Sequence, residues 1–587
     1  MNKIIRFFSI AMLFCIPSVA SAQYFMSGGI GYQVLSAEDH TVEVSIKSNC
    51  SPYSGNINIP PTVVSNGVTY DVVALGESAF SQARLTGVTI PSSVTQIKSS
   101  CFVFATCPRV INIPASVVEI GGAAFAASNL TTLNVDENNP NYMFMDGMLF
   151  SKDTTTLVEC LLSKSGTVAL PQATKHIAER AFGYCPSITS VTLPEGLESI
   201  GFYAFMSNSS LNNVVIPSSV SFIDGCPFAN CTRLNNLSIA EGNTHYYMDG
   251  MMIYSMGGDS LVSAHKSADS VFLPSTLHYV TGFAANNDVR YVSVPDGVTA
   301  ISPNAFCYSS LEGIDLPSQM QSIGAWAFEF CEALRRVAMP ASLDTLGQAC
   351  FEGCALLEAV DIPNGLRSIP VKAFLGCSSL SAITLGDAVE VIDTAAFAGC
   401  SVTELLFPST LRSIRMDAFV SYNYVGNMRS VVFNAPIDTL EPESFSQRHI
   451  GLLRLKNMVP PVSCTLPEYG ADYGCLYLSD VDSIIIPCGS LNAYLADSYW
   501  GLFADKYHED CNGIDEADAD DWSICPAGDC VAIRGAQGEA VYVFDVMGRQ
   551  LYHTASAAEE VTVRVPCSGV YIVKVGGSPA KKITIIQ

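Results

Sequence analysis

Apolar and polar positions along this chain follow a pattern that repeats about every 23 residues. Each repeat carries a phenylalanine, usually after an alanine, and successive phenylalanines stand 22 or 23 residues apart with a few longer gaps. A fixed period of this length predicts a solenoid, whose coils bury their apolar side only by stacking on their neighbours. The repeating residues are Phe80, Phe102, Phe125, Phe182, Phe205, Phe228, Phe283, Phe306, Phe328, Phe351, Phe374, Phe397, Phe419 and Phe445.

An aliphatic residue stands five positions before nearly every one of these phenylalanines. The coil of Phe283 breaks this rule, because His278 occupies the position. The aliphatic residues are Leu75, Ile97, Ile120, Ile177, Ile200, Ile223, Ile301, Ile323, Leu346, Ile369, Ile392, Ile414 and Leu440.

Most coils also contain a short alternating run that ends at a proline. Examples are Ile111-Asn112-Ile113-Pro114 and Val360-Asp361-Ile362-Pro363. Alternation with period two places one side chain inside and the next outside, as in a β-strand, and proline ends the strand because it has no N–H to donate. We predict that these runs stack into a parallel sheet, with the phenylalanine segment as a tight turn opposite.

Cysteines recur three residues after the phenylalanine in six coils. Ser128, Asn208 and Ser309 take this position in other coils, so it needs no disulfide partner. Zinc binding or thiol catalysis would need C-x-x-C spacing or a nearby histidine, and the column has neither. We predict small buried side chains that stack between coils. The cysteines are Cys185, Cys231, Cys331, Cys354, Cys377 and Cys400.

The repeat resembles the BspA-like leucine-rich repeats of bacterial surface proteins. Residues 323–340 and 369–385 follow the pattern I-x-x-x-A-F-x-x-C-x-x-L-x-x-[IV]-x-[IL]-P most clearly. The resemblance implies a mainly β fold, namely a leucine-rich repeat solenoid of about 23-residue coils with a parallel sheet, over residues 73–450. It also implies a role in surface binding or adhesion, with ligands that vary between members.

Two insertions lengthen the period, near residues 134–168 and 238–272. Asp146-Gly147 and Asp249-Gly250 lie between apolar runs, and such pairs predict β-hairpin turns. The BspA-like family has hairpins of this kind between coils. The two insertions also resemble each other, which favours a shared structural device over the local break expected of a catalytic solenoid.

The two ends of the array have their own signatures. Residues 1–22 read as a secretory signal peptide, with Lys3 and Arg6 before an apolar stretch and a small-residue cleavage site. Residues 23–72 resemble the usual N-terminal β cap of such arrays, with Ile30-Gly31-Tyr32 as one cap strand. Residues 451–505 resemble the usual C-terminal cap, which includes Trp500.

The tail differs from the repeats. An acidic linker is predicted over residues 506–532, and alternating strands with glycine turns over 533–587 predict a small β-sandwich. Val541 to Asp545, Ser568 to Val575 and Lys581 to Gln587 resemble the C-terminal sorting domain of type IX secretion. The resemblance implies recognition by the secretion machinery, transport across an outer membrane, cleavage near 510–535 and surface attachment.

Composition narrows the range of partners. Hydrophobic residues make up 49% and charged residues 14% of the 587 positions, which is typical of an ordered, buried chain. The net charge is −25, and loss of Lys3 and Arg6 with the signal would make it −27. Such a charge disfavours nucleic acid as a partner. Outside the signal, no apolar stretch is long enough for a transmembrane span.

The sequence offers no motif for catalysis, metal binding or a cofactor. The eight histidines are scattered, and neither H-x-x-x-H nor G-x-S-x-G occurs. His176 and His278 are therefore interpreted as coil-surface or core residues. Disulfides are plausible, with pairing left open, among the cysteines outside the column: Cys464, Cys475, Cys488, Cys511, Cys525 and Cys530.

Ligand contact is expected along the outward positions of the sheet. This column is small and mixed, and we expect no aromatic stripe for stacking on sugar rings, so a broad, shallow protein-binding face is predicted in preference to a deep pocket. The alternative is that the column is only the solvated outside of a sheet. The candidate residues are Thr89, Asn112, Thr192, Ser293, Asp315, Asp361 and Thr384.

Together these observations predict an exported, non-enzymatic surface protein. It would be attached to the outer membrane or extracellular, and it would bind protein or glycan ligands of host matrix, microbial or polymer origin. The alternative is a structural coat rod without a dedicated ligand.

Overall fold

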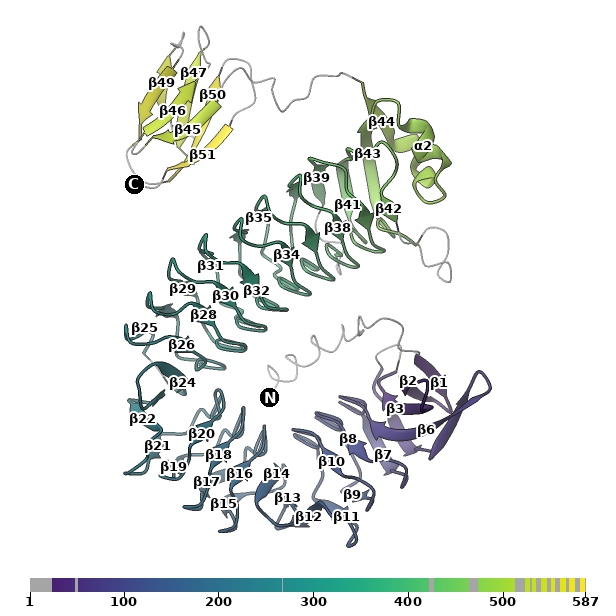
Figure 1. Ribbon diagram of the computed structural model, residues 1–587, viewed down its shortest axis with the longest axis vertical. Helices are drawn as coiled ribbons and strands as arrows, with labels where there is room; N and C mark the ends of the chain where they lie inside the picture. Colours follow the sequence, from purple (N-terminus) through teal and green to yellow (C-terminus); the bar gives the residue numbers. More distant parts are fainter. Residues whose placement is uncertain are drawn as a thin grey trace. The chain divides into compact units, whose positions relative to one another are not determined.

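The computed structural model describes residues 24–585 apart from 48–50, 267, 422–426, 464–472, 512–522, 528–529, 535–539, 546–549, 555–559, 566–568 and 576–580. The predicted signal peptide and residues 512–522 and 528–529 of the predicted acidic linker lie outside the described residues, whereas residues 507–510 and 523–527 of that linker form strands. The chain forms two compact units (Figure 1). The first runs to Ile486 and resumes over Ser490–His508, and the second comprises Pro487–Gly489 and the chain from Glu509 onward.

A sheet of antiparallel and parallel strands caps the first unit at its N-terminal end. It has the order β1-β2-β3-β6-β8-β10, with β5 added to β6. Tyr32 of β2 is fully buried in it. The predicted cap strands are thus present. Their bounds are β1 Tyr24–Ser27, β2 Ile30–Ser36, β3 Thr41–Ser45, β5 Thr62–Ser65 and β6 Val68–Leu75.

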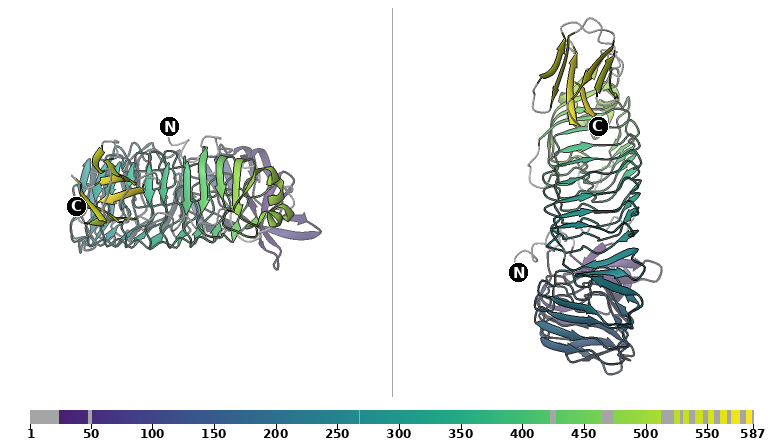
Figure 2. Two further views of the ribbon diagram at one scale, coloured as in Figure 1. Left: turned by 90° about the horizontal axis from the view of Figure 1, so that it is seen from above. Right: turned by 90° about the vertical axis from the view of Figure 1, so that its left-hand side faces the viewer.

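Stacked coils follow the cap, and the predicted parallel sheet is confirmed (Figures 1 and 2). Inward residues of these long strands are buried and outward ones are mostly exposed, as alternation requires. The strands are β4 Ser54–Asn58, β7 Arg84–Thr89, β9 Val110–Ile113, β11 Thr132–Val135, β15 Gly166–Ala169, β17 Ile188–Thr192, β19 Asn213–Ile216, β21 Asn236–Ile239, β25 Ser270–Phe272, β27 Tyr291–Ser293, β29 Gly313–Asp315, β31 Arg336–Val337, β33 Ala359–Asp361, β35 Ala382–Thr384, β37 Glu404–Phe407, β39 Met428–Phe433, β41 His449–Arg454 and β43 Asp480–Pro487.

A second parallel ladder, which the sequence pattern did not predict, runs through the aliphatic position before the phenylalanine. Its strands are two residues long, and the aliphatic side chain points inward. They are β8 Gln96–Ile97, β10 Glu119–Ile120, β16 His176–Ile177, β18 Ser199–Ile200, β20 Phe222–Ile223, β26 Tyr279–Val280, β28 Ala300–Ile301, β30 Ser322–Ile323, β32 Thr345–Leu346, β34 Ser368–Ile369, β36 Val391–Ile392, β38 Ser413–Ile414, β40 Thr439–Leu440 and β42 Val462–Ser463.

The phenylalanines lie inside the turns, as predicted, and stack on one another in three runs, Phe80 to Phe125, Phe182 to Phe228 and Phe283 to Phe445, which the two insertions separate. The Phe328 and Phe351 rings are 5.1 Å apart with planes 2° from parallel. Burial of each ring contributes roughly 1.5–3 kcal/mol, and ring pairing adds about 0.5–1.5 kcal/mol. The turn is held by backbone bonds to the next coil, such as Phe328 N–H to the Cys350 carbonyl at 2.8 Å.

The cysteine column has a hydrogen-bonding role besides its packing role. The Cys354 thiol donates to the Phe328 carbonyl of the preceding coil at 3.1 Å, and Cys377 does the same to Phe351. Asn208 takes over this bond in its coil, with Nδ2 donating to the Phe182 carbonyl at 2.9 Å, whereas the Ser128 hydroxyl donates to the Phe125 carbonyl of its own coil at 2.6 Å. This shared function explains why cysteine alternates with asparagine in the column.

The coil of Phe283 keeps the inward aliphatic position after all. Val280, three residues before the phenylalanine, pairs in register with Ile301 and is fully buried. His278 is exposed. The expectation of a missing aliphatic residue is therefore wrong, because two residues are deleted from the turn and not from the strand.

Each insertion adds a three-stranded antiparallel hairpin unit. The first comprises β12 Tyr142–Met145, β13 Met148–Ser151 and β14 Thr156–Cys160, and the second β22 Tyr246–Asp249, β23 Met252–Ser255 and β24 Ser260–Ala264. The predicted Asp146-Gly147 turn is confirmed. The second turn is one residue later than predicted, because Asp249 pairs with Met252 and leaves Gly250 at φ 58° as its first loop residue.

The insertions divide the long-strand sheet. β9-β11, β15-β17-β19-β21 and β25-β27-β29-β31 are separate sheets, and the breaks fall at the two hairpins. The outward face is therefore a set of segments and not one uninterrupted surface.

The C-terminal cap contains helix α2 (Leu491–Ala496), the 3-10 helix η3 (Trp500–Lys506) and edge strand β44 (Tyr507–Asp510). Trp500 is fully buried, and its indole N–H donates to the Pro461 carbonyl at 3.0 Å. A disulfide joins Cys488 to Cys511, whereas Cys475 is a buried thiol. Cys464 lies outside the described residues. Within the described part of the chain, no helix combines the length and the hydropathy needed to cross a membrane.

The second unit consists of two small sheets. They have the orders β45-β46-β49 and β48-β47-β50-β51, and they share a core that includes Val531, Val543 and Val573. This matches the predicted β-sandwich. The strands are β45 Ser523–Ala527, β46 Cys530–Arg534, β47 Val541–Asp545, β48 Gln550–Thr554, β49 Glu560–Arg564, β50 Gly569–Val575 and β51 Lys581–Ile585.

Candidate functional site

The predicted outward column lies where the alternation placed it. Thr89, Asn112, Thr192, Asp315, Asp361 and Thr384 are exposed on the long strands, and Ser293 is half-buried. These residues do not form one cluster, however, because they are distributed over separate sheets.

One exposed aromatic ring lies in the outward column, for which no aromatic stripe is predicted. Phe272 is the register partner of Ser293, so it belongs to the same column, and its side chain is 76% exposed. Tyr291 lies one strand further along, with its ring centroid 6.3 Å from that of Phe272. Val271-Phe272-Leu273-Pro274 is an alternating run that ends at a proline, like the strands of the other coils. This pattern could have shown that Phe272 takes an outward position.

A shallow depression of about 460 Å³ lies beside these rings on β27, β29 and β31. Gly313 is at its centre, in register with Tyr291 on one side and Arg336 on the other. The Tyr291 hydroxyl donates to the Asp315 carboxylate, which holds the ring in place. The missing side chain at Gly313 creates the space between ring and guanidinium.

A ladder of alternating charges borders the depression. Arg290 Nε lies 3.9 Å from Asp269 and 3.7 Å from Glu312, and Arg335 lies 3.6 Å from Glu358. Among the described residues, no ion pair includes Arg336, which is exposed. The segment thus presents one guanidinium without a carboxylate partner on an acidic protein.

A second depression of about 420 Å³ lies against the second hairpin. It is bounded by β21 and β22 and includes Tyr246, Tyr247 and Met256. Its lining contains no ionised side chain, so it offers less chemistry than the depression at Gly313.

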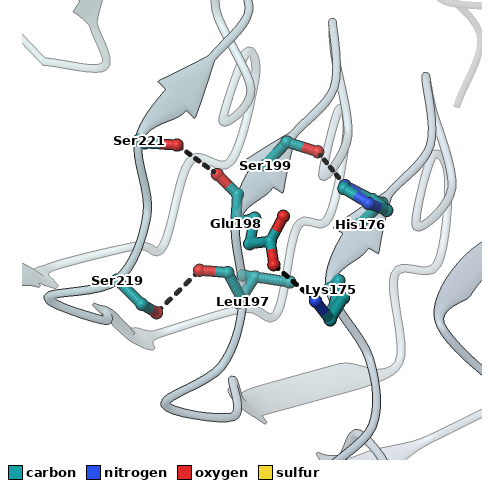
Figure 3. A network of polar contacts seen from close by, with 7 residues as sticks. All are labelled: Lys175, His176, Leu197, Glu198, Ser199, Ser219 and Ser221. Atoms are coloured by element: carbon teal, nitrogen blue, oxygen red, sulfur yellow. Dashed lines mark hydrogen bonds and ion pairs between the residues drawn. The ribbon is translucent and has the colours of Figure 1, made fainter.

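The short-strand face is occupied by contacts between coils. Lys175 pairs with Glu198 at 2.7 Å, and His176 Nδ1 lies 2.9 Å from the Ser199 hydroxyl (Figure 3). The Ser219 hydroxyl donates to the Leu197 carbonyl at 2.7 Å. These side chains already bind one another, and His176 is the coil-surface residue that was predicted.

The column cysteines are unsuited to nucleophilic chemistry. Burial raises the pKa of Cys331 and of Cys231 to about 12, so both thiols stay protonated at neutral pH. The thiolate is the reactive form of cysteine. The column therefore acts in packing and hydrogen bonding.

One histidine lies between two carboxylates at the C-terminal end of the sheet. His449 Nδ1 is 3.4 Å from Asp480, and Nε2 is 3.2 Å from Asp482. Each ring nitrogen therefore already faces a carboxylate of β43.

Comparisons with known proteins agree with this architecture. The model for the BspA type leucine rich repeat region matches in six copies, over residues 49–152, 159–255, 299–425 and 348–463. A second model, for a domain of unknown function (DUF6383), matches residues 512–585. No curated protein matches the chain.

Solved structures that resemble the chain are bacterial leucine-rich repeat proteins. A leucine rich cell surface protein from Faecalibacterium prausnitzii is 21% identical, with a TM-score of 0.35, over 62% of this chain and 95% of its own. The pneumococcal vaccine antigen PcpA is 19% identical, with a TM-score of 0.33, over 68% and 95%. A leucine-rich repeat protein from Bacteroides ovatus is 21% identical, with a TM-score of 0.29, over 78% and 99%.

The family matches cover more than half of the chain and coincide with the stacked coils. The chain therefore belongs to the family of proteins with BspA-type leucine-rich repeats.

Proposed function

We propose that the protein is a non-enzymatic binding module displayed at the cell surface, and that it binds its ligand on the outward face of β25, β27, β29 and β31. The observation that carries this proposal is the depression at Gly313, which is lined by Tyr291, the ion ladder and Arg336, with the exposed Phe272 ring next to that of Tyr291. Exposed aromatic and arginine side chains are the residues most enriched at recognition sites. Family membership supports a surface role.

The route to the surface forms part of the same proposal. Residues 1–22 would direct export, and the sandwich from residue 523 onward would serve as a sorting domain for type IX secretion. The tail's strand pattern and its two-sheet fold support this reading. Deletion of residues 523–587 in the producing cell should retain the protein inside the cell envelope, whereas a sorting-independent route would leave its surface exposure unchanged.

Binding is tested with the purified chain on an array of matrix proteins and glycans at physiological salt. Saturable binding that Phe272→Ala weakens would support the proposal. The control is Leu406→Ala, which removes another largely exposed outward side chain, 63% accessible, from strand β37 of a different sheet.

The second candidate function is a structural surface rod without a dedicated ligand. The observation in its favour is that the outward column is distributed over separate sheet segments and does not gather into one site. An array without saturable binding, from a protein whose folding is verified, would favour the rod.

A further inference from the structure

The space above Gly313 lies between side chains of the two neighbouring strands. Parallel strands are about 4.8 Å apart, so the backbones of Tyr291 and Arg336 flank the glycine at a separation of roughly 9–10 Å. A Cβ added at Gly313 would have one neighbour within 4 Å, the Tyr291 Cδ2 atom at 3.7 Å. The space is therefore open outward and is bounded by a ring and a guanidinium.

The charges around this space select for a particular ligand chemistry. Glu312 and Glu358 already neutralise Arg290 and Arg335, which leaves the Arg336 guanidinium to receive a carboxylate. The same acidic side chains, together with Asp315, are acceptors for hydroxyl groups and repel a densely anionic ligand. The ligand that fits these charges is a molecule with one carboxylate group and several hydroxyl groups.

The two rings add an apolar surface. Tyr291 and Phe272 lie side by side on neighbouring strands, and Phe272 is largely exposed. The C–H face of a sugar ring packs on such a surface, and the next sugar of a polymer can reach the second ring. An acidic peptide would use the guanidinium but would leave the acceptor groups unused.

We propose that this space binds a carboxylate-bearing sugar residue of a polysaccharide, with its ring on Tyr291 and its carboxylate on Arg336. This inference rests on the proposed function and names its ligand class. The overall negative charge does not prevent such binding, because charges more than about 8 Å away are largely screened at physiological salt. A charge-assisted, bidentate contact with Arg336 then dominates locally.

The test uses the full chain and two polymers that differ only in charge, namely polygalacturonate and its carboxyl-reduced neutral form, in titration calorimetry. We expect binding of the acidic polymer and at least about tenfold weaker binding of the neutral one, since hydrogen bonds to charged groups are the stronger ones. Arg336→Gln should remove this preference. Gly313→Val should fill the space and weaken binding of both polymers.

Two variants serve as matched controls. Arg367→Gln removes an exposed arginine that is ion-paired with Glu390 at 2.6 Å, and Ala382→Val places the same valine side chain at the corresponding outward position of β35. Both should bind polygalacturonate like the unchanged chain.

The outcomes separate the inference from the proposed function. Equal binding of both polymers, or an Arg336→Gln variant that keeps the preference, would overturn the carboxylate assignment and leave the binding module standing. Binding of neither polymer by a chain that binds another array component would also overturn it. If the folded chain bound neither polymer and no array component, both the carboxylate assignment and the proposed binding function would be overturned.

Discussion

The two hairpin insertions have the same backbone and differ in what they bury. In each, a buried asparagine anchors the first strand: Asn139 Nδ2 donates to the Pro114 and Val117 carbonyls, and Asn243 donates to Pro217 and Val220. The asparagine Oδ1 then accepts two backbone N–H groups of the hairpin.

The first insertion buries an acid. Both carboxylate oxygens of Glu159 lie 3.1 Å from the Phe125 N–H, at the position where the next coil would otherwise supply a carbonyl. Burial raises the pKa of Glu159 to about 8, although the bond from Phe125 opposes the shift. Ser263 holds the equivalent register position in the second insertion.

The second insertion buries a histidine instead. His265 Nδ1 lies 3.1 Å from the Phe228 carbonyl and Nε2 lies 3.2 Å from the Leu234 carbonyl. Burial lowers the pKa of His265. A neutral imidazole has one N–H, so it can donate to one of these carbonyls at a time.

This difference teaches that the repeat backbone fixes where a polar group is needed but not which group supplies it. The two choices have opposite consequences for pH dependence. A buried acid with a raised pKa lowers the free energy of unfolding as pH rises. A buried histidine with a lowered pKa lowers the free energy of unfolding as pH falls.

Replacing Glu159 by Gln should give the largest change. In the unchanged protein, the folded state keeps a proton that the unfolded state releases, so the unfolding free energy falls by up to about 1.4 kcal/mol per pH unit between about pH 4.5 and 8. Glu159→Gln should flatten this slope, as measured by urea unfolding from pH 5 to 8.5. The exposed Glu137→Gln is the control, and equal slopes in both variants would contradict the assignment.

Removing the shared anchors should destabilise both insertions to a similar degree. Asn139→Ala and Asn243→Ala each break four hydrogen bonds and leave buried backbone groups without partners, at a cost of roughly 2–4 kcal/mol. Hydrogen exchange at each hairpin measures the local loss. A large effect at only one insertion would show that the backbones are not equivalent.

Replacing His265 by Leu should make the second insertion resemble the first, which has Leu161 there. The unchanged protein should lose stability as pH falls below about 6.5, because the unfolded histidine binds a proton that the buried ring does not. His265→Leu should abolish this acid-side loss while costing about 1 kcal/mol at pH 8. A thermal unfolding series from pH 5 to 8 decides between these outcomes, with the exposed His278→Leu as control.

The smallest effect should come from an ion pair that only the first insertion has. Lys164 Nζ lies 2.6 Å from Asp146, whose side chain is 71% exposed, and Ala268 takes the equivalent position in the second insertion. Lys164→Ala should therefore cost less than about 1 kcal/mol, and less still in high salt. A larger, salt-independent loss would indicate that the lysine stem contributes by packing.

The regular coils could be predicted in detail from the sequence. The period gave the solenoid, and the A-F segment gave the buried turn, because every coil repeats the same local constraints. The second ladder was harder to see, since a two-residue strand such as Ser322–Ile323 has no periodicity of its own. The pairing of Cys488 with Cys511 also required the fold, because the sequence left the pairing open among six candidate cysteines between residues 464 and 530.

The candidate site was less predictable than the coils. The outward column was correctly placed, but Phe272 was missed because the preceding insertion hides its coil from the regular spacing. The depression depends on Tyr291, Gly313 and Arg336, which are 22 and 23 residues apart and come together only when three coils stack in register.

The sequence by itself determined the repeat, its inward residues and its family, because these follow from short-range patterns that every coil carries. The tertiary structure alone decided which outward residues became neighbours, where the sheet was interrupted and which buried groups titrate abnormally. These features depend on the register and burial of whole coils, so no single coil encodes them.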